Sequence, residues 1–231
     1  MLSDAYPGSL SHRQQATELA VFLLLIVPSL VLSFAGTGGD HLSFPLVALA
    51  TILRDLGLLA LVLLLVARAR EPLAAIGWVR EGAGREAWWG LLLAVPTLIG
   101  TQLLQAALRA AGLSGPPPTD SAVTPRGSFG DLLLALILVV VVAISEETIF
   151  RGYLMLRFSR VLHSRAWAVV LSALVFAIGH GYEGGAAVVT IGLTGVAFAL
   201  VYLWRRSLVA VVIMHFALDF VALVVAPALR P

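Results

Sequence analysis

Seven long apolar stretches dominate this chain and constrain its fold more than any other feature of the sequence. Most of them are about 20 residues long, which is the length of an α-helix that crosses a lipid bilayer. Backbone amides find no water partners in lipid, so spanning segments of this kind must be helical. We therefore expect an all-α fold, a polytopic transmembrane helix bundle with about seven spans. The stretches are Leu19–Phe34, Phe44–Val66, Trp88–Leu108, Leu132–Phe150, Trp167–His180, Ala186–Trp204 and Leu208–Ala228.

The composition supports this interpretation and excludes several classes of protein. Apolar residues make up 60% and charged residues 12% of the 231 residues, whereas a soluble domain is about half apolar and a quarter charged. A disordered chain, a nucleic-acid binder and an ordinary water-soluble enzyme are therefore excluded. We predict a single integral membrane domain over residues 1–231, with a motif-bearing core at about 130–228. Its surroundings are the lipid bilayer, and no nucleic acid is expected as a partner.

The placement of arginine predicts the orientation. Arginines gather before the first stretch and after the second, fourth and sixth, where the segment after Phe150 carries Arg157, Arg160 and Arg165. The alternate segments are poor in arginine, which places the N-terminus inside and the C-terminus outside. All 15 basic residues are arginine, which is typical of a GC-rich bacterial gene and indicates a bacterial plasma membrane. We interpret the first stretch as a retained helix, because its flanks lack the positive region of a signal peptide.

Ionisable residues inside the apolar stretches carry the functional information. Each costs about 2.5–3.5 kcal/mol at the bilayer centre, and a whole domain is stable by only about 5–15 kcal/mol. A cluster of them therefore requires mutual pairing, a wet cavity or a function. The set comprises Arg54, Asp55, Glu146, Glu147, Arg151, His180, His215 and Asp219.

The acidic pair Glu146 and Glu147 is the first member of this set. Glu147 and Arg151 are four residues apart and share a helix face, so they are expected to form an ion pair. Glu146 lies about 100° round the helix and is free to point into a cavity. A glutamate there is suited to take a proton from water. The alternative is a plain ion-pair lock between helices, which the residues leave open.

The remaining polar residues are less specific. His180 ends an apolar stretch before a glycine-rich turn, and it is either a hydrogen-bonded core residue or part of a site. His215 and Asp219 are four residues apart and share one face, so Asp219 can orient the imidazole and fix its tautomer. Arg54 and Asp55 are adjacent and do not face each other on a helix. We interpret them as structural residues that each pair elsewhere.

Taken together, these groups make a set suited to water activation in a membrane. Two glutamates, two histidines, an arginine and an aspartate come from three separate helices. Glutamate and histidine are also zinc ligands, but the His-Glu-x-x-His arrangement is absent. The residues leave open whether a divalent metal such as zinc takes part or no cofactor is needed.

Three motifs give the chain a family resemblance. The first is Glu146-Glu147-Thr148-Ile149-Phe150-Arg151, followed by Gly152 and Tyr153, the second runs from Phe176 to His180, and the third from His215 to Asp219. In order and spacing they resemble the CPBP intramembrane protease family. That family is also called the type II CAAX prenyl protease or Abi family, and its motifs are Glu-Glu-x-x-x-Arg, Phe-x-x-x-His and His-x-x-x-Asn. The first three apolar stretches carry no such likeness.

The resemblance implies an intramembrane peptidase that acts on a membrane-associated protein or peptide. Glu146 and His180 would activate a water molecule, and His215 and Asp219 would hold the oxyanion. Glu147 and Arg151 would support the site. The last motif position is often Asn in the family, and an ionised aspartate cannot donate a hydrogen bond. Asp219 is therefore either protonated or limited to orienting the imidazole.

Two other functions compete with the peptidase. One is a non-catalytic membrane scaffold or bacteriocin-immunity protein, in which the charges only lock the helices together. The other is a proton-coupled transporter, because intramembrane acids and histidines also mark ion pathways. The absence of an internal repeat disfavours the transporter.

Overall fold

The computed structural model describes residues 10–32, 34, 43–113, 124–125 and 128–229, and this part of the chain is helical without strands. Each of the seven apolar stretches forms a helix, which confirms the all-α prediction. The long helices are α1 His12–Leu32, α2 Phe44–Arg68, α3 Ala83–Ala110, α4 Phe129–Glu147, α6 Arg165–Ile178, α7 Gly185–Arg205 and α8 Leu208–Phe220. Short elements join or extend them: η2 Leu73–Ile76, η3 Thr148–Leu154, α5 Met155–Val161, η4 Gly181–Glu183, η5 Val221–Val225 and α9 Ala226–Ala228.

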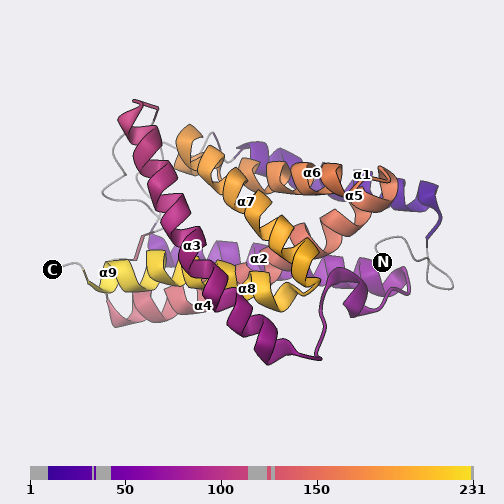
Figure 1. Ribbon diagram of the computed structural model, residues 1–231, viewed down its shortest axis with the longest axis horizontal. Coiled ribbons are helices and arrows are strands. Elements are labelled where there is room, and N and C mark those ends of the chain that lie inside the picture. Colours follow the sequence, from indigo (N-terminus) through magenta and orange to yellow (C-terminus); the bar gives the residue numbers. More distant parts are fainter. Residues whose placement is uncertain (1–9, 33, 35–42, 114–123, 126–127, 230–231) are drawn as a thin grey trace.

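One long helical segment organises the bundle. Helix α4, the π-helical segment η3 and helix α5 follow one another without a break over Phe129–Val161. The α4 half packs against α2 and α8, while the α5 half packs against α1 and α6. Figure 1 shows the two halves reaching different parts of the bundle. The segment thereby connects two groups of helices, and η3 lies at the point where they meet.

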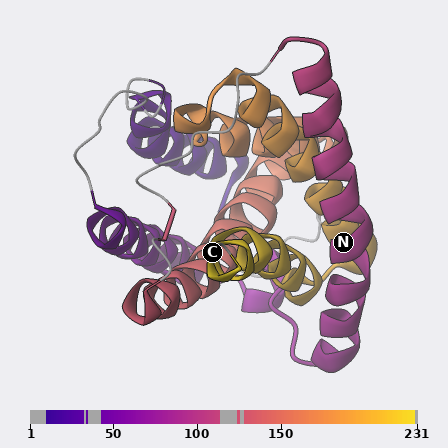
Figure 2. The ribbon, with the colours of Figure 1, turned by 90° about the vertical axis from the view of Figure 1, so that its left-hand side faces the viewer.

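The other helices complete these two groups. Helices α6 and α7 form an extensive pair beside α5. Helix α3 runs along one side of the bundle and crosses both α7 and α8 (Figures 1 and 2). The crossing with α8 is close at Gly90, where an added Cβ would lie 2.5 Å from the carbonyl oxygen of Ala210. Only a residue without a side chain lets the two backbones approach this far.

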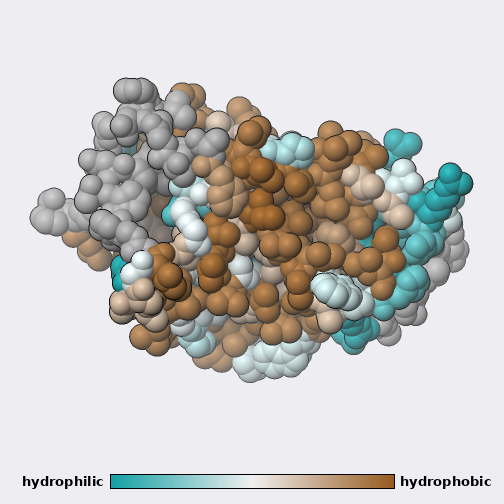
Figure 3. All heavy atoms as spheres, turned by 90° about the horizontal axis from the view of Figure 1, so that it is seen from above, coloured by the Kyte–Doolittle hydropathy of each residue, from teal (hydrophilic) through white to brown (hydrophobic). Residues whose placement is uncertain are grey.

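The surface of the described residues is that of a membrane protein. Six helices are long and apolar enough to cross a bilayer, and large apolar side chains such as Leu24 and Leu53 are 73% and 70% exposed. Figure 3 shows a broad hydrophobic face bounded by hydrophilic atoms at one end. These features make the chain an integral membrane protein. Helix α6, with 14 residues, is the shorter seventh helix.

The observed helix ends differ from the predicted ones in two informative places. The first helix starts at His12 rather than near Leu19, because the polar first turns pack on α5 through residues such as His12 and Glu18. The fourth continues past Phe150 to Val161. Arg157 is consequently part of a buried helix, whereas we had counted it with the charges of a connecting segment.

Candidate active site

The Glu-Glu-x-x-x-Arg motif lies at the centre of the long helical segment. Glu146 and Glu147 end α4, and Arg151 lies in η3. Glu147 and Arg151 are both fully buried, and their atoms Oε1 and Nη1 are 2.9 Å apart. The ion pair predicted from the four-residue spacing is thus confirmed.

The π-helical backbone beside the motif is stabilised by side-chain hydroxyls. A π-helical turn breaks the regular hydrogen-bond ladder and often marks a functional site. Thr148 donates its hydroxyl to the carbonyl of Ile144 at 2.6 Å and accepts a hydrogen bond from the Trp78 indole at 3.1 Å. From α6, Ser172 donates to the carbonyl of Phe150 at 2.7 Å. These contacts hold the segment in a conformation that a regular helix would not keep.

Arg151 is enclosed by two rings and one backbone carbonyl. Its Cζ atom lies 4.2 Å from the ring centre of Phe176 and 5.4 Å from that of Phe198. Its Nη2 donates to the carbonyl of Gly195 at 3.3 Å. A Cβ at Gly195 would lie 3.1 Å from that nitrogen, so a glycine leaves room for the guanidinium. These contacts enclose the guanidinium, and its ion pair holds Glu147 in turn.

His215 from α8 completes the cluster. Its Nδ1 lies 2.8 Å from Oε1 of Glu147, and its Nε2 lies 3.3 Å from Oδ2 of Asp219 and 3.9 Å from Oε2 of Glu146. We assign the Nδ1 proton to the bond with Glu147, since a carboxylate can only accept. The sequence predicted Asp219 as the residue that orients this imidazole. The shorter contact with Glu147, which is fully buried, makes Glu147 the principal orienting group, and Asp219 lies at the other nitrogen.

Glu146 differs from its neighbour because its carboxylate is not consumed by an ion pair. Its Oε2 is buried and has no hydrogen-bond partner among the described residues. Arg54 and Asp55 of α2 interact with it electrostatically. Our expectation that these two residues pair elsewhere is wrong, since Arg54 Nε lies 2.9 Å from Asp55 Oδ1. Adjacent side chains can meet in this way because the arginine is long enough to fold back along its helix.

His180 approaches the cluster from the turn between α6 and α7. Its Nδ1 lies 3.0 Å from the carbonyl oxygen of Phe176, which accepts a hydrogen bond and leaves Nε2 available. The Phe176 ring contacts both histidines, with ring centres 4.9 Å from His180 and 6.1 Å from His215. Burial lowers the pKa of the His180 imidazole, which favours the neutral ring. No described hydrogen bond or ion pair joins it directly to Glu146.

The structure therefore gathers the six predicted residues around two aromatic rings. Glu147, Arg151, His215 and Asp219 form one connected set, Glu146 borders it, and His180 joins it through Phe176. Sequence reasoning missed the link between Glu147 and His215, which no local spacing encodes. It also missed Thr148 and Ser172, although a threonine inside an apolar run is itself a signal of backbone hydrogen bonding.

The arrangement does not provide a recognisable metal site. Among the described residues, no three His, Cys, Asp or Glu side chains are placed to hold one ion. Arg151 and His215 instead occupy the accepting oxygen Oε1 of Glu147. We therefore derive the chemistry from the side chains and water.

A second buried charge cluster lies one to two turns further along the same segment. Arg157 is fully buried and contacts Glu18 of α1 at 2.8 Å and Glu71, which follows α2, also at 2.8 Å. Tyr153 donates its hydroxyl to Glu18 at 2.9 Å, and Arg160 pairs with Glu71. Two arginines face two glutamates here, so the charges balance. The cluster joins three parts of the fold, and no local spacing in the sequence predicts the pairing.

Fold and site together define a polytopic helical membrane protein with a buried acid, arginine and histidine cluster. Residues 128–221 match the family model described as type II CAAX prenyl endopeptidase Rce1-like. The segment that carries all three motifs therefore matches this family, which confirms the resemblance. The match begins just before α4 and leaves out α1, α2 and α3. Neither a curated protein nor a solved structure matches the chain.

Proposed function

We propose that this protein is an intramembrane endopeptidase of the CAAX-protease type, in which Glu146 is the general base. The family of the matched segment implies a protease with a membrane-associated protein substrate. The observation that carries the assignment is the contrast between the two glutamates. Oε2 is buried without a partner in both residues, but Glu147 Oε1 is held by Arg151 and His215, whereas among the described residues no hydrogen bond reaches Glu146, whose Oε2 lies 3.9 Å from His215 Nε2.

The proposed reaction uses the side chains as follows. Glu146, assisted by the neutral His180, removes a proton from water, and the water oxygen attacks the carbonyl carbon of the scissile bond. The oxyanion that forms accepts a hydrogen bond from Nε2–H of His215, whose imidazole carries a proton on both nitrogens in this mechanism. When the carbon–nitrogen bond breaks, the proton held by Glu146 passes to the leaving amine. The products are a new carboxyl group and a new amino group.

Asp219 has a limited role in this mechanism. Its oxygen lies 3.3 Å from His215 Nε2, close enough to hold the imidazole until substrate arrives. With 31% of its side chain exposed, it is the most accessible carboxylate of the connected set. We therefore assign it an orienting role and leave oxyanion stabilisation to His215.

The scaffold or immunity alternative retains one supporting observation. The ion pair between Glu147 and Arg151 holds the segment in place, and a non-catalytic protein needs only this structural role from the two residues. That function does not use a buried carboxylate oxygen without a partner. From the all-arginine composition we further assign the protein to a bacterial plasma membrane.

The deciding experiment compares protein termini in membranes from cells that express the wild type or Glu146→Gln. We expect new termini only with the wild type, because glutamine keeps the shape of the side chain but cannot take the proton. Asp131→Asn, a charge-matched change in the first turn of α4, serves as the control and should retain cleavage. Identical profiles for wild type and Glu146→Gln, at equal expression, would contradict the peptidase.

A further inference from the structure

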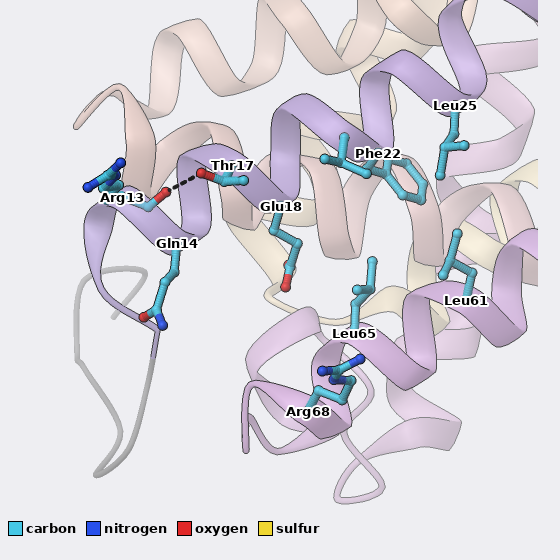
Figure 4. A pocket seen from close by; sticks show the side chains of 10 residues that line it. Arg13, Gln14, Thr17, Glu18, Phe22, Leu25, Leu61, Leu65 and Arg68 are labelled. Carbon is cyan, nitrogen blue, oxygen red and sulfur yellow. Dashed lines mark hydrogen bonds between the residues drawn. The ribbon is translucent and has the colours of Figure 1, made fainter.

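A cavity of about 630 Å³ lies between α1 and α2, away from the cluster around Glu146. Figure 4 shows its side chains, which come from the first turns of α1 and the last turns of α2. One end is polar and is lined by Arg13 and Gln14 of α1 and by Arg68 of α2. The other is apolar, with Leu25, Leu61 and Phe22 among its walls. Cavities of about 300–1,000 Å³ hold small organic ligands.

The polar end carries two positive charges that the described residues leave without an ion-pair partner. The guanidinium groups of Arg13 and Arg68 make no hydrogen bond or ion pair with any residue that the structure describes. Glu18 also lines the cavity, but its Oε1 accepts hydrogen bonds from Tyr153 and Arg157. The buried arginine therefore balances Glu18, and an anion is the ligand that complements the opening.

The apolar end opens toward the lipid-facing surface. Val21 and Leu25 line the cavity and are 52% and 60% exposed, on a helix that is long and apolar enough to span the membrane. A small soluble anion would leave this wall uncovered. A molecule with an anionic head and a hydrocarbon tail would complement both ends at once.

We propose that this cavity binds one anionic phospholipid. Its phosphate would lie between Arg13 and Arg68, and the first part of an acyl chain would follow the groove between Leu25 and Leu61. Both arginines lie at the end of the bundle that the arginine distribution predicts to be cytoplasmic. The lipid would come from that leaflet and would connect α1 to α2, which lie side by side here.

The proposed lipid would stabilise the fold rather than take part in the reaction. Glu18 contacts both the cavity and the long segment that carries the motif, through Tyr153 and Arg157. A ligand that binds only the folded state raises the unfolding temperature, by an amount that grows with the logarithm of one plus the ratio of its free concentration to its Kd. Thermal stability is therefore a readout that does not depend on the proposed peptidase activity.

The test measures thermal unfolding of the full-length chain in detergent with added dioleoyl phosphatidylglycerol or dioleoyl phosphatidylcholine. We expect phosphatidylglycerol to raise Tm by about 3 °C or more, and phosphatidylcholine to have a much smaller effect. The double variant Arg13→Gln, Arg68→Gln should lose the difference. Arg80→Gln, which removes an exposed charge between α2 and α3 outside the cavity, should keep it.

Three results would overturn the proposal. Equal shifts of Tm with phosphatidylglycerol and phosphatidylcholine in the wild type would mean that the cavity does not recognise the lipid charge. This result does not depend on whether the double variant folds. A full phosphatidylglycerol effect in the double variant would place the lipid elsewhere. A shift of the same size with glycerol 3-phosphate would mean that an anion, and not a lipid, occupies the cavity.

Discussion

Two buried charge clusters lie on one continuous helical segment, and they differ in which polar atoms lack a hydrogen-bond partner. Around Arg151, one arginine pairs with Glu147, and His215 contacts that carboxylate as well as those of Glu146 and Asp219. Around Arg157, two arginines face two glutamates, and both oxygens of Glu71 are bonded. Among the described residues, the first cluster leaves one oxygen each of Glu146 and Glu147 and the Nε of Arg151 without partners, whereas the second leaves the Nη2 of Arg157 and no carboxylate oxygen.

The difference separates a reactive site from a structural one. A buried polar group without a partner destabilises the fold and persists where it has a task. A carboxylate oxygen left open can take a proton, whereas a guanidinium stays charged and cannot act as a base. Substitutions in the Arg151 cluster should therefore act mainly on cleavage, and those in the Arg157 cluster mainly on folding.

Glu146→Gln tests the reactive side of this comparison and should have the largest effect. Loss of the general base should lower the cleavage rate by about 10²–10⁴-fold. Tm should stay within about 2 °C of the wild type, because no described ion pair of Glu146 is shorter than 3.9 Å. Rates are measured on a substrate identified by its new terminus, and Tm in detergent. A large loss of Tm would mean that Glu146 is structural.

Arg157→Met tests the structural side. Removal of the guanidinium leaves Glu18 and Glu71 buried without their common partner, and breaking a buried pair in this way costs about 3–5 kcal/mol. We expect Tm to fall by about 10 °C in a thermal unfolding experiment. Arg80→Met removes an exposed arginine and is the matched control. A variant with normal stability but no cleavage would reverse the assignment of the two clusters.

Glu147→Gln should affect both properties, because this residue pairs with Arg151 and orients His215. A weakened charged hydrogen bond costs about 1.5–3 kcal/mol of stability. A misplaced imidazole should lower cleavage by about 10²-fold. The measurement compares the Tm and the cleavage rate of Glu147→Gln with those of Glu146→Gln. Unchanged Tm in Glu147→Gln would remove the distinction between the two glutamates.

Ser172→Ala should have the smallest effect. It removes one of two hydrogen bonds to the Phe150 carbonyl, which keeps the backbone N–H of Met155. The loss of one such hydrogen bond costs about 1 kcal/mol. Tm should fall by about 2–4 °C. Ser159→Ala is the control, since that hydroxyl bonds a carbonyl three residues earlier in its own helix. Equal effects of the two serines would mean that η3 needs no support from α6.

The sequence by itself determined the helices and the local pairing. An apolar run long enough to span a bilayer must form a helix, because its backbone groups find no water partners in lipid. The all-α bundle therefore follows from hydropathy. The Glu147–Arg151 ion pair follows from the four-residue spacing on one helix. The family resemblance rested on order and spacing within the same segment, and the family match falls on those residues.

Only the tertiary structure decided which distant groups meet. Glu147 and His215 are 68 residues apart, Arg157 and Glu71 86 residues apart, and both pairs depend on how helices cross. The fourth helical segment continues past Phe150, although charged residues follow there, because α1 and α6 pack against α5 and Arg157 is buried among them. Charged residues in membrane spans can be read from the sequence, but whether each is paired or open depends on packing. That packing distinguishes Glu146 from Glu147.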